Sequence, residues 1–290
     1  MMMMNNATNL LVAALCSSLL FWVDACSAFA AVPTIITRTS LLQSSASTDE
    51  PSTTNSVLDL KIKLVNLCTQ GGSKPQESAV QACVKSLEDA AEQMGLGQSS
   101  SSSGLLNGEW ELLYSPEDLT RSSPFFWAFK RAIPEYADQI FGITDAIPSP
   151  IKDVGPAIQK IDMNENSSGT LVSRVKVATL NGMATSMMTT KATIIGSLGY
   201  DGLELQVETT QPEESTIVKT LLGPLASVVE GNLPAFPSGE ALERVMPGSS
   251  RVVMKTTFCD ETLRVSRNAD EPNRVFVWTR RSFGSPSEAF

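Results

Sequence analysis

The chain has 290 residues, of which 31 are acidic and 22 basic, and it contains no histidine. The absence of histidine excludes a Ser-His-Asp or Cys-His catalytic pair, a zinc site built on paired histidines and an imidazole proton shuttle. The net charge of −9 argues against a nucleic-acid partner, because binding to phosphates requires clustered Lys and Arg. The hydrophobic fraction of 42% is sufficient for a packed core. These counts describe a soluble globular protein.

Two targeting segments are predicted at the start of the chain. Residues 10–23 form an uncharged apolar run followed by small residues, which is typical of a signal peptide and places one at 1–28. The run is shorter than the ~20 residues that a membrane-spanning helix needs, so a signal peptide is favoured over a membrane anchor. Residues 29–48 are rich in Ser and Thr and carry one basic and no acidic residue. That composition predicts a transit peptide, which we place at 29–50.

The junction of these two segments, CSAFAAVP at residues 26–33, resembles the motif of bipartite plastid presequences. Algae whose plastids arose by secondary endosymbiosis use this motif, which places an aromatic residue directly after the cleavage point. Phe29 takes that position, whereas Cys26 stands where the motif has Ala. Ordinary secretion is the alternative interpretation of the same segment.

A helical hairpin is predicted over 56–97. Between Ser56 and Gln70 the apolar residues recur every three or four positions, and the same spacing resumes after Gly71-Gly72 and continues to Gly95. Two helices joined by a tight turn cannot bury both of their apolar faces by themselves, so the hairpin must dock on a later part of the chain. A serine-rich stretch at 98–104 is predicted to be a flexible linker.

From residue 105 to residue 281 the apolar period changes to two, which predicts a domain made mainly of antiparallel strands. The predicted strands are 108–114, 157–163, 170–179, 185–195, 203–208, 215–221, 251–258, 261–267 and 274–280. Turn signals such as Asp201-Gly202 and Pro247-Gly248 separate them. Eight or nine short strands indicate a closed antiparallel barrel or a sandwich. Residues 282–290 are predicted to be a tail.

An aromatic segment interrupts the strands between Ser123 and Ile133. It begins with a helix-start signal and ends at Pro134. A lid packed over the barrel mouth is the favoured role, and insertion into a lipid surface is the alternative, because basic residues follow the aromatic ones. The candidate side chains are Phe125, Phe126, Trp127 and Phe129.

The first predicted strand opens with the pair Gly108-x-Trp110, a feature of lipocalin-type barrels. In such barrels a Trp near the closed end packs against an Arg of the last strand, and Arg280 or Arg281 is the expected partner. A plug of the barrel floor is favoured over ligand contact for Trp110. An eight-stranded barrel is wide enough for one small apolar ligand. The candidates for its interior, which could equally form a filled core, are Trp110, Leu112, Tyr114, Val175, Val177, Leu203, Leu205 and Val207.

Two sequence motifs carry a resemblance to a known family. LLNGEWELLYS at 105–115 resembles the opening of the plastid lipid-associated protein (PAP)/fibrillin family, and TTFCDETLRVSR at 256–267, followed by VFV at 275–277, is similar to its closing hairpin. The preceding pair of helices also belongs to the family pattern. The resemblance covers residues 57–280, is weakest over 133–166 and departs from the family at the turn 268–273, where the family usually has a glycine-containing loop.

The resemblance implies a lipocalin-like antiparallel barrel preceded by an α-helical hairpin. It also implies a plastid location, in the stroma or at plastoglobules or thylakoids, and the binding of lipids or isoprenoids such as carotenoids, quinones or tocopherols. Together with the predicted targeting segments, it indicates peripheral association with a plastid lipid surface.

The closing hairpin contains three charged candidates that the resemblance places at the functional or structural end of the barrel: Asp260, Arg264 and Arg267. Arg267 shares the parity of Leu263 and Val265, whereas Arg264 points to the opposite face. We expect one arginine to enter the barrel and pair with Asp260, and we assign Arg267 to the interior.

Structural roles are expected for Arg264, Asp260, Gly108 and Arg280. A salt-bridged surface edge of small energetic value is an equal alternative to ligand contact for the charged residues of the hairpin.

Three functions are compatible with the sequence. The favoured one is a non-catalytic protein that binds or sequesters apolar lipids. The second is an accessory protein whose N-terminal helices dock an enzyme of plastid isoprenoid-quinone biosynthesis, and the third is an enzyme acting on a barrel-bound lipid, for which no paired-carboxylate or nucleophile motif is present. Cys68, Cys83 and Cys259 are too widely spaced for a metal knuckle or a disulfide framework. No cofactor, metal or nucleic acid is expected.

Overall fold

The structure is a computed structural model, and it describes residues 57–69, 74–95, 104–145, 152–179, 184–214, 216 and 235–281. The predicted targeting segments, most of the predicted linker at 98–104 and the tail at 282–290 lie outside the described residues. The strand predicted at 215–221 also lies outside them, except for Thr216.

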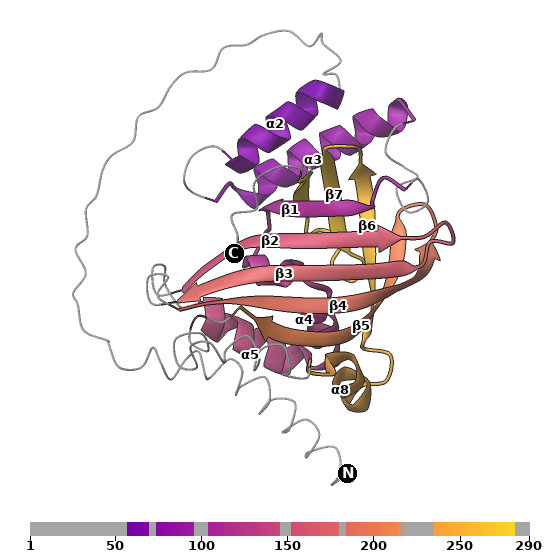
Figure 1. The fold of residues 1–290 in the computed structure, drawn as a ribbon. Helices are drawn as coiled ribbons and strands as arrows, with labels where there is room; N and C mark the ends of the chain where they lie inside the picture. Colours follow the sequence, from indigo (N-terminus) through magenta and orange to yellow (C-terminus); the bar gives the residue numbers. More distant parts are fainter. Residues whose placement is uncertain are drawn as a thin grey trace, which may run out of the picture.

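Eight antiparallel strands form a closed barrel in which each strand pairs with its sequence neighbours and β1 pairs with β8 (Figure 1). The strands are β1 (Gly108–Tyr114), β2 (Lys152–Met163), β3 (Gly169–Thr179), β4 (Ala184–Leu198), β5 (Gly202–Glu213), β6 (Arg251–Cys259), β7 (Leu263–Asn268) and β8 (Phe276–Arg280). The predicted barrel is confirmed. Strands β2, β4 and β5 are longer than the alternating pattern indicated, because ladder hydrogen bonds continue past the last alternating residues.

The two N-terminal helices, α2 (Val57–Thr69) and α3 (Glu77–Gln93), form the predicted hairpin. Figure 1 shows them on the outside of the barrel, over β1 and β7. Their apolar faces and the outer faces of four strands form one buried group, called here the hairpin cluster. Its members are Leu60, Leu64, Val80, Cys83, Val84, Leu87, Ala91, Tyr114, Phe258, Leu263, Val265, Val275 and Val277. The hairpin therefore buries its apolar surface against the barrel wall, as its amphipathic pattern requires.

A second, larger group of buried residues lies on the inside of the barrel and is called here the interior cluster. It includes residues of β1 to β6 and β8 together with the aromatic face of α4 (Pro124–Ala132). The 3₁₀ helix η1 (Leu119–Ser122) precedes α4, and α5 (Pro134–Asp145) follows it. No helix in the described part of the chain is long and apolar enough to cross a membrane.

A short helix that the sequence did not reveal, α8 (Ser238–Val245), packs against β5 and α4. It approaches β5 very closely, because a Cβ atom at Gly239 would clash with the backbone carbonyl of Val207. Leu242 is the fully buried apolar residue of α8, and it joins the interior cluster. A helix of eight residues with so few apolar positions leaves little periodic signal in the sequence.

Two of the register shifts in the barrel, in β1 and β6, determine which side chains of these strands face the inside. The register of β1 against β8 shifts between Leu112 and Tyr114, and that of β6 against β7 shifts between Thr256 and Phe258. Each extra residue turns the following side chains to the other face of the sheet. Leu112 therefore lies in the interior cluster, whereas Tyr114 lies in the hairpin cluster.

Candidate functional site

Trp110 and Arg280 close one end of the barrel. The indole of Trp110 is fully buried, and its Nε1 donates a hydrogen bond to the carbonyl of Leu106 at 2.8 Å. The Cζ atom of Arg280 lies 4.2 Å from the centre of the Trp110 ring. Its guanidinium also donates to the carbonyl oxygens of Asn107 and Leu105, and Nε donates to that of Glu261 at 2.7 Å. The structure thus brings together the Trp and Arg that the G-x-W pair predicts.

Gly108 is required at this end of the barrel for two reasons. Its φ angle is +123°, a conformation that residues with a Cβ atom rarely adopt. A Cβ atom at this position would also lie 2.6 Å from Nη1 of Arg280. The G-x-W pair is therefore a structural device, in which the glycine makes room for the arginine that covers the tryptophan.

The prediction that Arg267 enters the barrel is wrong. Arg267 lies outside, where its Nη1 and Nη2 atoms contact the two carboxylate oxygens of Glu88 on α3 at 2.7 and 3.1 Å. Arg264 is the arginine that points inside, and it is fully buried. The alternating parity was assigned correctly, but Leu263 and Val265 face the hairpin cluster and not the interior.

Asp260 does not pair with either arginine. It accepts hydrogen bonds from the backbone N–H groups of Thr262 and Leu263 at 2.8 and 2.9 Å, and it forms an ion pair with Lys61 of α2. Desolvation raises the pKa of Asp260, but the hydrogen bonds from Lys61 and the two backbone groups outweigh it and hold the pKa below its ordinary value. Asp260 therefore shapes the β6–β7 turn and fastens the hairpin to it.

Arg264 lies between two tryptophans in the middle of the barrel. Its Cζ atom is 4.5 Å from the ring centre of Trp278 and 5.2 Å from that of Trp110. Its Nη2 donates to Oε1 of Gln159 on β2 at 2.6 Å, whereas Nε and Nη1 have no hydrogen-bond partner among the described residues. Burial lowers the pKa of Arg264 to about 9, so the side chain still carries its charge at neutral pH.

A row of polar side chains on the inner face of the barrel begins at Gln159, the hydrogen-bond partner of Arg264. Gln159, Ser173, Thr190 and Thr210 occupy adjacent register positions on β2 to β5, and the first three are buried. Nε2 of Gln159 donates to the carbonyl of Ser122 in η1 at 3.0 Å. Sequence analysis missed Gln159, because a single glutamine in a strand has no distinguishing pattern.

Most of the apolar candidates for the interior lie where they were expected. The residues that join the interior cluster are Trp110, Leu112, Val175, Leu203, Leu205 and Val207. Val177 is half-buried near the end of β3 and is not part of that cluster. Tyr114 is outside the barrel because of the bulge in β1.

The aromatic segment packs into the barrel from the end opposite Arg280. Phe125, Trp127 and Phe129 are buried in the interior cluster, and Phe126 packs against it. The rings of Trp127 and Phe276 lie 5.8 Å apart. Lys130 and Arg131 bind Glu271 and Asp270 of the β7–β8 loop. In this arrangement α4 covers part of the barrel interior with the buried side chains of Phe125, Trp127 and Phe129.

The interior offers little acid, base or nucleophile chemistry. No Asp or Glu side chain is buried among the described residues, and no group of three potential metal ligands occurs within them. Burial raises the pKa of Cys259 to about 11, so its thiol is neutral at neutral pH. The site combines apolar surface with hydrogen-bonding groups and a buried cation.

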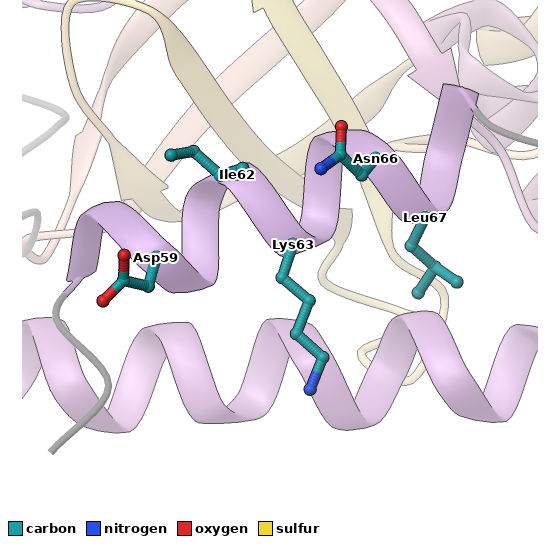
Figure 2. Close-up of a pocket in the computed structure, with 5 residues that line it drawn as sticks. All are labelled: Asp59, Ile62, Lys63, Asn66 and Leu67. Atoms are coloured by element: carbon teal, nitrogen blue, oxygen red, sulfur yellow. The ribbon is translucent and has the colours of Figure 1, made fainter. Parts of the chain in front are cut away.

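A shallow groove of about 450 Å³ lies along α2, away from the barrel interior. Figure 2 shows the residues that line it, with Lys63 directed towards the neighbouring helix. Ile62, which lines the groove, is 51% exposed, and the neighbouring Leu58 is 61% exposed. This face of α2 therefore carries apolar side chains that the fold itself does not cover.

Comparison with known proteins identifies the family. The PAP_fibrillin family model matches residues 59–278, which are 220 of the 290 residues and run from α2 into β8. No curated protein and no solved structure matches the chain. The matched region contains the G-x-W opening and the β6–β7 hairpin described above. On this evidence the chain belongs to the PAP/fibrillin family, whose members are associated with plastid lipids.

Proposed function

We propose that this protein is a non-catalytic plastid lipid-associated protein that binds or sequesters an apolar lipid or isoprenoid inside its barrel. The observation that carries the proposal is the extensive apolar surface inside a closed barrel, supplied by residues such as Val175, Leu205 and Val207. Carotenoids, quinones and tocopherols are the ligand classes that fit the family. Family membership also supports action in the plastid, at plastoglobules or thylakoids.

A blocked barrel provides the test. Ala192 lies on the inner face of β4, and Lys191 is exposed on its outer face. We expect lipid to co-purify with the wild-type protein and with Lys191→Phe, and the amount to fall several-fold in Ala192→Phe. Mass spectrometry of organic extracts measures the bound lipid, and near-ultraviolet circular dichroism checks that each variant is folded. A wild-type protein that stays empty and takes up no lipid would contradict the proposal.

A second function is favoured by the uncovered apolar face of α2. Ile62 lines the groove shown in Figure 2 and is exposed, and Leu58, four residues earlier on α2, is exposed as well. Exposed apolar surface of this kind is used to dock other proteins. The partner that fits the barrel's role is an enzyme of plastid isoprenoid-quinone biosynthesis, which would pass its apolar product to the barrel.

Site-specific cross-linking tests this second function. A photoreactive side chain at Ile62 should cross-link an isoprenoid-quinone biosynthetic enzyme in a plastid extract. The same group at Glu92, which is exposed on α3, is the matched control and should not. Equal cross-linking from both positions would show that α2 has no special role.

The predicted targeting segments complete the proposal. A fusion of residues 1–50 to a fluorescent protein should accumulate in plastids of an alga with secondary plastids, whereas Phe29→Ala should divert it. Secretion of both fusions would support the alternative interpretation of the presequence.

A further inference from the structure

Arg264 is a buried cation that no acid of the described chain neutralises. It is fully buried, it forms no ion pair with any described residue, and no Asp or Glu is buried in that part of the protein. Two of its N–H-bearing atoms, Nε and Nη1, have no acceptor there. A buried charge and unpaired donors are both unfavourable, so folded proteins normally supply a partner for them.

The contacts that Arg264 does make leave its charge largely uncompensated. Trp278 and Trp110 provide the faces of their rings, and Gln159 provides a neutral acceptor at 2.6 Å. The neighbour on β6, Cys259, is a neutral thiol, and Arg280 adds a charge of the same sign nearby. Arg267, three residues along the same strand, has a carboxylate partner in Glu88. Among the described residues, the outer arginine therefore has an acidic partner and the inner one has none.

Other donors and acceptors near Arg264 form a connected polar group inside the barrel. Gln159 joins Arg264 to the carbonyl of Ser122, which is the last residue of η1. The next residue, Ser123, is buried, and its hydroxyl has no partner among the described residues. Apolar residues of the interior cluster surround this group. Such a combination is suited to a ligand with one polar end and a long apolar body.

We propose that the barrel binds a lipid that ends in a carboxylate, and that Arg264 receives this carboxylate through the N–H groups that Gln159 leaves unpaired. Guanidinium and carboxylate groups attract each other through charge-assisted hydrogen bonds, which are strongest where water is excluded. The lipid's carboxylate supplies the negative charge that the protein lacks around Arg264. The inference rests on the proposed lipid-binding function and narrows it to acidic lipids, such as fatty acids or carboxylated isoprenoids.

The experiment compares an acid with its methyl ester. The probe is cis-parinaric acid, whose polyene quenches tryptophan emission, and the tryptophans Trp110, Trp127 and Trp278 all lie in the interior cluster. We expect the wild-type protein to bind the acid at least about tenfold more tightly than the ester. Arg264→Gln should abolish this preference while leaving ester binding within about threefold of its wild-type value. Arg267→Gln, on the outer face, should retain the preference.

Each outcome decides the inference. Equal affinities of the wild-type protein for acid and ester would overturn it and leave the proposed lipid-binding function intact, whereas no binding of either probe would overturn both. A merely structural role for Arg264 would make Arg264→Gln weaken both probes equally. If Arg264→Gln does not fold, the wild-type ratio still tests the inference, and Arg264→Lys, which keeps the charge, should preserve part of the preference. Competition with palmitic acid and with a carboxylated isoprenoid then identifies which apolar chain the barrel prefers in its ligand.

Discussion

The wall formed by β1, β6, β7 and β8 has two buried faces. They differ in whether their charged side chains have partners of opposite charge. On the outer face, which packs against the hairpin, Arg267 is paired with Glu88 and Asp260 with Lys61. On the inner face, Arg264 has two tryptophans and a glutamine but no acid. The arginine of the outer face is paired within the described chain, whereas Arg264 on the inner face keeps unpaired N–H groups. This difference is the basis of the proposal that the inner face binds a ligand.

Removing a large side chain from the inner face should have the largest effect. Trp278 is fully buried, contacts Arg264 and donates a hydrogen bond to Ser266 at 2.8 Å. We expect Trp278→Ala to lower the free energy of unfolding by about 3–5 kcal/mol, through lost packing and the cavity that it leaves. Chemical denaturation measures the change, and lipid binding should weaken as well. A loss below about 1 kcal/mol would show that the inner face is loosely packed.

An equivalent change on the outer face should separate stability from binding. Leu87 of α3 is fully buried in the hairpin cluster. Leu87→Ala should lower the free energy of unfolding by about 2–5 kcal/mol. Lipid affinity measured where the variant is fully folded should not change, because Leu87 does not reach the interior. A changed lipid affinity in Leu87→Ala would show that packing on the outer face of the wall affects binding on its inner face.

The paired arginine of the outer face allows a smaller, matched comparison. Glu88→Gln removes the partner of the partly buried Arg267 and should lower the free energy of unfolding by about 1–3 kcal/mol. Lys85→Gln breaks the exposed pair with Asp89 on the same helix and should change it by less than about 0.5 kcal/mol. Equal losses of stability in Glu88→Gln and Lys85→Gln, measured by thermal denaturation, would show that the partly buried ion pair stabilises the protein no more than the exposed one.

Acid should weaken the outer face through Asp260. Its pKa in the folded state is below the ordinary value, so its contribution to stability is present above the unfolded-state pKa of about 4 and is lost as the pH falls through the folded-state pKa. Unfolding measured between about pH 6 and about pH 2.5 should therefore show a steeper loss for the wild-type protein than for Asp260→Asn. Parallel curves would exclude Asp260 as a source of acid sensitivity.

The smallest effect is expected at Tyr114. Its hydroxyl is buried in the hairpin cluster without a hydrogen-bond partner in the described chain, and burial raises its pKa to about 12. Tyr114→Phe removes this unpaired group and keeps the ring, so the free energy of unfolding should stay within about 0.5 kcal/mol of the wild-type value or rise. A clear loss of stability in chemical denaturation would reveal a partner for the hydroxyl.

The two-residue alternation predicted an antiparallel barrel or sandwich, and the amphipathic pattern predicted the hairpin. The resemblance to the PAP/fibrillin family favoured the barrel, and the lipocalin-type G-x-W pair predicted the contact of Trp110 with Arg280 or Arg281. The orientation of β7 was not predictable, because the hairpin gives the strand a second apolar environment on its outside. Leu263 and Val265 therefore looked like interior residues, and Arg264 and Arg267 were assigned to the wrong faces. The bulge that turns Tyr114 outwards also has no signal in its sequence, since Leu112, Leu113 and Tyr114 are all apolar or aromatic.

The pairing of β1 with β8 has a consequence for how the barrel is completed. All other strand pairs of the barrel join sequence neighbours, but this pair joins Trp110 of the first strand to Arg280 of the last. Pairing of strands that are far apart in the sequence costs chain entropy before the stabilising contacts form. We therefore expect the pairing of β1 with β8 to be a late step in folding. A chain shortened before Phe276 would expose the edges of both β1 and β7 to pairing with other chains. The last strand therefore protects the whole sheet from aggregation.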